Sequence, residues 1–295
     1  MGNKMSLYLY EVFKTVAEYK SFSRTAEAMH ITPSAVSHAI ANLEEQFGFA
    51  LFERSRKGVQ LTVNGEKMLP LVNRVRECNE NVLQEAGRIN DSDVGEVRIG
   101  VLHSVALTWM PEIIKRFKDK YPNIEVRIYE AGYDEISDLL YKHAIDLGIV
   151  ADSFVKAGQM FELLVKDHMV CVVPEDFTTE SEKMITVGEI KRGKLLMQYD
   201  AGEIELKKFL EDNEISVDEY IKVDDDNVMV ALVEQGLGIS VVPGLCVKNS
   251  RRKVKILGLK PDVYRNLGLV TASTRSPAPA TVKMIAEIKN YVKTV

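Results

Sequence analysis

Short polar side chains cluster on one face of a helical stretch near the N-terminus of this 295-residue chain. In "SRTAEAMHITPSAVSHAIANLEEQFG", residues 23–48, helical spacing puts apolar residues on one side of the second helix and small or polar residues on the other. The polar side consists of Ser34, Ser37, His38, Ala41 and Glu45. Short polar groups let a helix approach base edges closely enough to hydrogen-bond them, so this face could read a major groove. A helical hairpin with a merely solvated outer face is the alternative.

Capping residues predict where these helices begin and end. Ser23 is expected to cap the first helix, and Thr32 the second, with Pro33 at its first helical position. Gly48 suits the left-handed conformation that ends a helix. Thr62 is expected to cap the long helix that follows the hairpin. Because only a tight turn separates the two helices, the stretch predicts a helix-turn-helix.

The segment that follows, residues 51–61, predicts two short strands joined by a tight turn. It carries Arg54, Arg56 and Lys57. In a hairpin beside the reading helix, these cations could contact the phosphates that flank a groove. A solvated turn is the alternative.

Three pieces in this order, "SFSRTAEAMHITPSAVSHAIANLEEQFG", "LFERS" and "LTVNGE", resemble the N-terminal domain of LysR-type transcriptional regulators. Further along, "GISVVP" is similar to the second lobe of that family's effector domain, so the resemblance spans nearly the whole chain. It implies a winged helix-turn-helix, a linker helix and a two-lobed α/β sensor similar to type 2 periplasmic binding proteins. The residues expected at the DNA are Arg24, Ser34, Ser37, His38, Ala41, Arg54, Arg56 and Lys57.

Two of these positions depart from the family's pattern. His38 stands where the family often has arginine, and Ala41 stands where a basic residue is common. The reading helix therefore carries few phosphate contacts. We expect Arg24 and the hairpin to supply more of the electrostatic attraction, which falls as salt rises.

The chain is expected to divide into three parts. Residues 1–63 form the winged helix-turn-helix, 64–90 the linker helix and 91–295 the effector domain. Within the last part, lobe 1 covers about 95–163 and 267–295, and lobe 2 covers about 164–266. Strands alternate with helices there, which predicts an α/β fold with a largely parallel sheet.

An apolar stripe along the linker helix predicts pairing with a second helix. Its members are spaced by three, four or seven residues, as in a coiled-coil seam: Leu71, Val75, Cys78, Val82 and Ile89. The alternative is burial of the same stripe against the protein's own effector domain. We expect a homodimer through this helix, and a tetramer built from dimers.

Two loops are expected to bring effector-binding residues together. Ligands in open α/β folds bind beyond the carboxyl ends of strands, and anions favour helix N-termini. The expected residues are His103, Ser104, Val105, Gln198 and Tyr199, with Asn227 as a weaker candidate. A structural histidine at His103 and a simple helix cap at Ser104 are the alternatives.

Charge and motif content exclude several other classes. The net charge is −5, but residues 1–90 hold 11 Lys/Arg against 10 Asp/Glu, so one end of the chain can approach DNA. The three scattered cysteines fit neither a disulfide framework nor a zinc site. No catalytic motif, metal-ligand spacing or dinucleotide loop is present, and neither a membrane-spanning run nor a signal sequence is expected.

We therefore expect a cytoplasmic transcription factor without enzymatic activity, cofactor or metal. It would bind inverted repeats in promoter DNA, contact RNA polymerase and respond to a small-molecule effector of unknown identity. A solute-binding or transport-type protein is one alternative. A constitutive DNA-binding protein with a vestigial sensor is the other.

Overall fold

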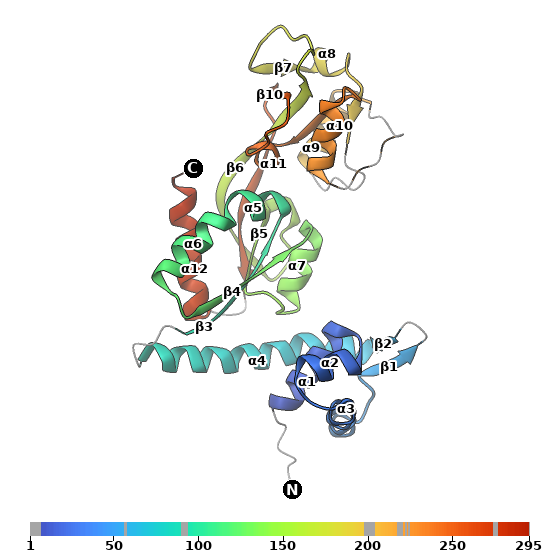
Figure 1. Cartoon of the computed structure of the whole chain (residues 1–295), viewed down its shortest axis with the longest axis vertical. Coiled ribbons are helices and arrows are strands. Elements are labelled where there is room, and N and C mark those ends of the chain that lie inside the picture. Colours follow the sequence, from blue (N-terminus) through green and yellow to red (C-terminus); the bar gives the residue numbers. More distant parts are fainter. Residues whose placement is uncertain are drawn as a thin grey trace.

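Three parts follow one another along the long axis of the molecule (Figure 1). A winged domain and the long helix α4 lie at one end, lobe 1 of the effector domain lies in the middle, and lobe 2 lies at the other end. The computed structural model describes residues 7–55, 58–89, 94–197, 204–216, 221, 223, 225–273 and 277–294. For residues 54, 55, 58, 88 and 89 it describes the backbone alone.

The winged domain is a small helical core with a two-stranded antiparallel hairpin. Helix α1 packs against both α2 and α3, and Phe13, Val16, Val36 and Leu43 are fully buried between these elements. Its elements are α1 (Leu7–Tyr19), α2 (Phe22–Ala28), α3 (Pro33–Phe47), β1 (Phe52–Ser55) and β2 (Gly58–Leu61).

Most of the predicted helix ends are confirmed. The Thr32 hydroxyl accepts a hydrogen bond from the backbone N–H of Ala35 at 3.2 Å, Pro33 opens α3, and Gly48 ends it at a φ of 76°. The prediction that Ser23 caps the preceding helix is wrong, because Ser21 is the cap and its hydroxyl accepts from the N–H of Arg24 at 3.4 Å.

The earlier start of α2 has a packing reason. It places Phe22 on the helix, where its ring meets Phe52 edge-on with the ring centroids 6.4 Å apart. Phe22 and Phe52 both pack against the buried core of the winged domain. Hydrophobic packing of Phe22 against the hairpin therefore favours a helix cap at Ser21 over one at Ser23.

Helix α4 (Val63–Ile89) links the winged domain to lobe 1. The hydroxyl of Thr62 accepts from the N–H of Gly65 at 3.0 Å, so the predicted cap is confirmed. The helix then continues as one element through Pro70.

Lobe 1 is a five-stranded sheet covered by helices. Its strand order is β4-β3-β5-β11-β6, in which β3 runs parallel to β4 and β5, and β11 runs antiparallel to its neighbours. Its elements are β3 (Gly95–Val101), α5 (His103–Thr108), α6 (Met110–Lys120), β4 (Ile124–Glu130), α7 (Tyr133–Tyr141), β5 (Leu147–Ala151), the 3-10 helix η1 (Asp152–Phe154), β11 (Tyr264–Ala272) and α12 (Pro279–Val292).

Lobe 2 is built around the second half of the 16-residue strand β6 (Gln159–Pro174). Residues 159–168 of β6 pair with β11 in lobe 1, whereas residues 169–174 pair with β9 and β10 in lobe 2. The remaining elements are β7 (Met184–Thr186), α8 (Val187–Ile190), β8 (Leu195–Leu196), α9 (Ile204–Asp212), α10 (Asp226–Glu234), β9 (Ile239–Pro243), α11 (Gly244–Val247) and β10 (Val254–Lys260).

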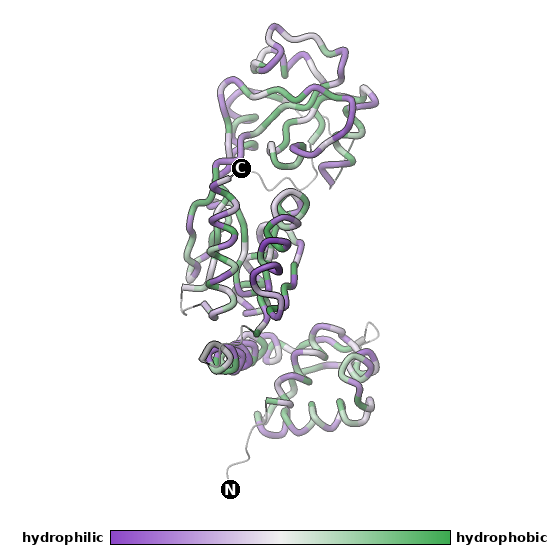
Figure 2. Tube along the Cα trace, turned by 60° about the vertical axis from the view of Figure 1, so that its left-hand side comes forward, coloured by the Kyte–Doolittle hydropathy of each residue, from purple (hydrophilic) through white to green (hydrophobic). Residues whose placement is uncertain are grey.

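The two-lobed α/β architecture is confirmed, but the sheet is mixed instead of largely parallel. Strands β6 and β11 run antiparallel to each other where the chain crosses between the lobes. Each lobe has its own buried core, and the strands at the centre of both lobes are largely hydrophobic (Figure 2). Among the described residues, no helix is both long and apolar enough to span a bilayer.

Candidate nucleic-acid interface and effector site

Helix α3 presents the polar face expected of a reading helix. Ser34, His38 and Ala41 are exposed and Ser37 is half-buried, while the opposite face is buried in the winged domain. The hydroxyls of Ser34 and Thr32 lie 2.9 Å apart, so the first turn of the helix is held by two linked hydroxyls. A rigid helix with short exposed side chains suits close contact with base edges.

The structure adds Asn42 to this exposed face. Asn42 lies one turn beyond His38 and beside Ala41, and its Oδ1 accepts from Nε2 of Gln46 at 2.6 Å. Carboxamide side chains are well suited to pairing with adenine. Helical spacing from His38 could have identified this residue, because positions four apart share a face.

The basic residues of the winged domain are only partly described. Arg24 is exposed on α2, and its guanidinium lies over the ring of Tyr19 at 5.5 Å from the ring centroid. Arg54 lies on β1, where the backbone alone is described, and Arg56 and Lys57 lie outside the described residues. The Tyr19 contact restrains the guanidinium of Arg24 at this exposed position.

The predicted seam of α4 lies uncovered in the single chain. Leu71, Val75 and Val82 are 55%, 43% and 67% exposed, and Cys78 is also exposed. Of Ile89 only the backbone is described. The alternative, burial of this stripe against the protein's own effector domain, is therefore not what the structure shows.

His103 joins the two lobes. Its Nδ1 lies 2.7 Å from Oε1 of Glu130 in lobe 1, and its Nε2 lies 3.2 Å from Nδ2 of Asn227 on α10 in lobe 2. The sequence identified His103 and Asn227 separately, and the structure brings them into contact. Gln198 and Tyr199 lie outside the described residues.

Ser104 belongs to a buried polar network instead of capping a helix. The cap of α5 is Leu102, and the hydroxyl of Ser104 accepts from Nη2 of Arg265 at 3.1 Å. The side chain of Val105 is buried in the core of lobe 1, so only its backbone can face a ligand. The helix-cap alternative for Ser104 is thus wrong.

Arg265 and Asp167 form the centre of that network, and sequence reasoning missed both. Nε and Nη2 of Arg265 donate to Oδ2 of Asp167 at 2.9 and 2.7 Å, and Nη1 donates to the hydroxyl of Tyr133 at 2.6 Å. Oδ1 of Asp167 accepts from the N–H of Leu245 on α11 in lobe 2 at 3.1 Å. The pair lies on the two crossing strands and connects elements of both lobes.

Two of the three thiols, those of Cys171 and Cys246, are poorly suited to nucleophilic or redox chemistry. Burial raises the pKa of the Cys171 thiol to about 12. Burial and the nearby carboxylate of Asp226 raise the pKa of Cys246 well above its usual range. Because the thiolate is the reactive form, neither residue is an activated nucleophile. No cluster of metal-binding side chains occurs within the part of the chain that the structure describes.

The fold and these surfaces define a winged helix-turn-helix protein with a two-lobed ligand-binding domain. The sequence model described as "Bacterial regulatory helix-turn-helix protein, lysR family" matches residues 7–66, and "LysR substrate binding domain" matches residues 90–293. The chain belongs to the LysR family of transcriptional regulators. It is a DNA-binding transcriptional regulator with an effector-binding domain, and not an enzyme.

Relatives of full length support this assignment. The HTH-type transcriptional regulator YvbU of Bacillus subtilis (strain 168) is 25% identical over 287 residues, which cover 96% of this chain and 97% of YvbU. YbhD of Escherichia coli (strain K12) is 26% identical over 292 residues, covering 97% of this chain and 92% of YbhD. The helix-turn-helix match to residues 7–66 also excludes a simple solute-binding protein.

Solved structures share the fold. Full-length OxyR from Pseudomonas aeruginosa has a TM-score of 0.76 at 19% identity, covering 99% of this chain and 96% of OxyR. Full-length CbnR complexed with its target DNA has a TM-score of 0.67 at 17% identity, covering 97% of this chain and all of CbnR. At these identities the likeness shows the fold alone.

We predict that the Arg265–Asp167 network is energetically coupled. Arg265→Met should lower the free energy of unfolding of the effector domain by about 3–5 kcal/mol, because it leaves the Asp167 carboxylate buried without its cation. The double variant Arg265→Met with Asp167→Asn removes that charge and should lose less than the two single variants summed. Chemical denaturation of the full-length protein measures both quantities. Additive losses would show that the two side chains do not act as a pair.

Proposed function

We propose that this regulator binds an interrupted inverted repeat in promoter DNA as a dimer, and that a small molecule between the lobes of its sensor alters that binding. The observation that carries the proposal is the exposed polar face of α3, which is held by a fully buried core on its other side. We place the DNA-binding domain at 1–63, the linker helix at 64–90 and the effector domain at 91–295. Binding to DNA in the cytoplasm and contact with RNA polymerase complete the proposed role.

The DNA contacts are of two kinds. Ser34, Ser37, His38 and Ala41 would face base edges, with Asn42 beside them. Arg24, Arg54, Arg56 and Lys57 would face phosphates. Phosphate contacts fix the position of a protein on the duplex, whereas base contacts supply sequence preference. The described surface supports this division, since the small residues lie along α3 and Arg24 lies on the neighbouring helix α2.

A specificity measurement separates the two kinds of contact. Ser37→Ala should weaken binding to the preferred sequence by roughly 1–3 kcal/mol and leave binding to random DNA unchanged, because a base contact is lost. Arg24→Gln should weaken both about equally and flatten the salt dependence. Competition gel shifts at several salt concentrations provide the readout, with Arg192→Gln in lobe 2 as the matched charge control. If Ser37→Ala and Arg24→Gln behaved alike, the proposed division of contacts would be wrong.

The dimer would form through the exposed stripe of α4. Leu71, Val75, Cys78 and Val82 repeat at coiled-coil spacing on a face that no described part of the same chain covers. An uncovered apolar stripe of this length is typical of a surface that is buried by association. We include Ile89 in this seam from its position along the helix, and propose that dimers pair further into a tetramer.

A charge placed in the stripe tests this seam. Val82→Lys should convert the protein to monomers at micromolar concentration, because pairing would bury two unpaired ammonium groups close together. Val228→Lys is the control, since Val228 is 49% exposed on α10 in lobe 2. Analytical ultracentrifugation measures the mass of each variant. A Val82→Lys protein that remained dimeric would place the interface elsewhere.

We propose the effector site at the junction that His103 and Asn227 already bridge. Both side chains carry polar atoms that face the opposite lobe, so a ligand that replaced their mutual hydrogen bond would touch both lobes. Ser104, the backbone of Val105, Gln198 and Tyr199 complete the proposed set. A ligand shifts the arrangement of the lobes only by the difference in its affinity for the two arrangements.

A further inference from the structure

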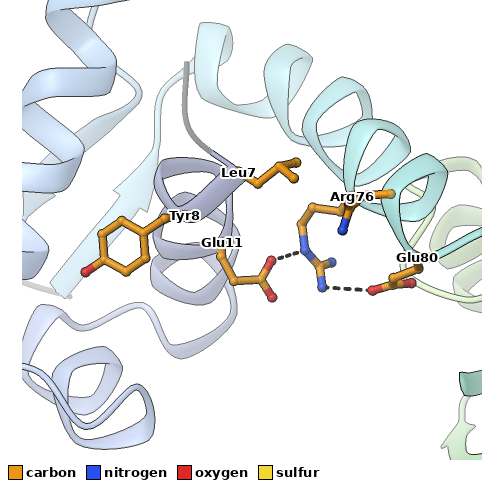
Figure 3. A pocket seen from close by; sticks show the side chains of 6 residues that line it. Leu7, Tyr8, Glu11, Arg76 and Glu80 are labelled. Atoms are coloured by element: carbon orange, nitrogen blue, oxygen red, sulfur yellow. Dashed lines mark hydrogen bonds and ion pairs between the residues drawn. The ribbon is translucent and has the colours of Figure 1, made fainter. Parts of the chain in front are cut away.

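A line of alternating charges crosses from the winged domain to the effector domain. It begins at Glu11 on α1, whose Oε2 accepts from Nε of Arg76 on α4. Nη2 of Arg76 also donates to Oε1 of Glu80 at 3.3 Å (Figure 3). The side chain of Arg76 is only 11% exposed, so one largely buried guanidinium holds carboxylates from two helices.

The same line continues into lobe 1. The other carboxylate oxygen of Glu80 lies 3.9 Å from Nη2 of Arg98 on β3. Arg98 is buried and holds Asp146 through three hydrogen bonds, from its backbone N–H at 2.8 Å, from Nη2 at 2.8 Å and from Nε at 3.2 Å. Glu80 therefore stands between two guanidinium groups that belong to different parts of the molecule.

Three neighbours of Glu80 on the same side of α4 also contact lobe 1. Nδ2 of Asn73 donates to the carbonyl of Lys142 at 2.7 Å, and Oε2 of Glu77 lies 3.1 Å from Nδ1 of His143. Oε1 of Gln84 accepts from the N–H of Ala280 at 3.3 Å. Asn73, Glu77 and Gln84 are each at least 94% buried. The polar side chains at helical spacing on this side of α4 therefore form a contact surface for lobe 1 and not a solvent-exposed face.

We propose that this charge line fixes lobe 1 to the winged domain, with Glu80 as the positioning residue at its centre, so that lobe 1, α4 and the reading helix α3 move as one body. The regulatory role of this connection rests on the proposed DNA-reading function of α3. The connection between lobe 1 and the winged domain does not depend on that function. A change in the sensor would then reach α3 through α4 and α1, which packs on both helices.

The energetics of buried charges favour one geometry for this joint. Burial raises the pKa of Glu80, and the charges of Arg98 and Arg76 oppose that rise. Removing a charge from water is costly unless a partner and further hydrogen bonds replace the solvent. A displacement of lobe 1 along α4 would separate Glu80 from one of its two cations and leave a charge partly buried without a partner. The joint therefore resists sliding and gradual bending.

Hydrogen exchange of the full-length protein, without DNA or effector, tests the link. Glu80→Gln should speed backbone exchange roughly tenfold in residues 73–84, 95–101 and 142–147, because losing a hydrogen bond to a charged group eases local opening by that factor. Lobe 2 should be unchanged. Glu66→Gln is the control, because it makes the same charge change at an exposed position of α4. Equal exchange in the two variants would overturn the proposal, whether or not the chain binds DNA as proposed.

A second variant, at the end of the charge line on α1, tests the proposal even if the Glu80→Gln protein fails to fold. Glu11 is 42% exposed on α1, so Glu11→Gln should fold. The proposal predicts faster exchange in β3 of lobe 1, although the carboxylate of Glu11 bonds to Arg76 on α4, outside that strand. It also predicts that Glu11→Gln and Glu80→Gln together fall short of the product of their separate effects, because both bind Arg76. Faster exchange confined to α1, or effects that multiply, would refute it.

Discussion

The geometry of one helix constrains the whole molecule. Helix α4 has 27 residues and about 3.6 residues per turn, so each face can serve only one partner. Its first turns complete the core of the winged domain, where Val72 is buried. Its polar face, at Asn73, Glu77 and Gln84, contacts lobe 1, and its apolar face on the opposite side lies uncovered. A single rigid element therefore positions the reading helix α3, the effector domain and the proposed dimer partner.

Buried ion pairs occur at both joints of the chain. Arg98 and Asp146 anchor the contact between α4 and lobe 1, and Arg265 and Asp167 hold the crossing between the lobes. Such pairs add little net stability when compared with apolar residues of similar size, but breaking one of them is costly. Their value in a regulator is that they favour a few defined arrangements of its parts. Switching between two such arrangements, in place of gradual deformation, is what a ligand-controlled DNA-binding protein requires.

Local signals in the sequence predicted local structure well. Thr32, Pro33, Gly48 and Thr62 act within a turn of their own helices, and the structure confirms all four. The cap predicted at Ser23 is wrong, because packing of Phe22 on Phe52, 30 positions away, favours a cap at Ser21. The first half of β6 carries no such local signal. Residues 159–168 lie at the crossing between lobes, where burial does not alternate regularly along the strand.

Long-range polar contacts were beyond sequence reasoning. Arg265 and Asp167 are 98 positions apart, and no spacing rule relates them. Polar residues at helical spacing, such as Asn73, Glu77 and Glu80 on α4, ordinarily indicate a solvent-exposed face. Here they contact lobe 1 instead. His103 and Asn227 were found as separate candidates because each follows a strand or opens a helix, but only the fold shows that they meet. Sequence identified the kinds of surface, and tertiary structure determined which of them face one another.

We propose that two copies of α3 read DNA as a symmetric pair. Selection of bound duplexes from a random pool by the full-length protein, followed by hydroxyl-radical footprinting of the enriched sequence, tests it most directly. A symmetric pair of reading helices should select an inverted repeat whose half-sites lie on one face of the duplex, with centres separated by about 10–10.5 base pairs or a multiple of that spacing. Enrichment of a single unpaired site, or no enrichment at all, would contradict it.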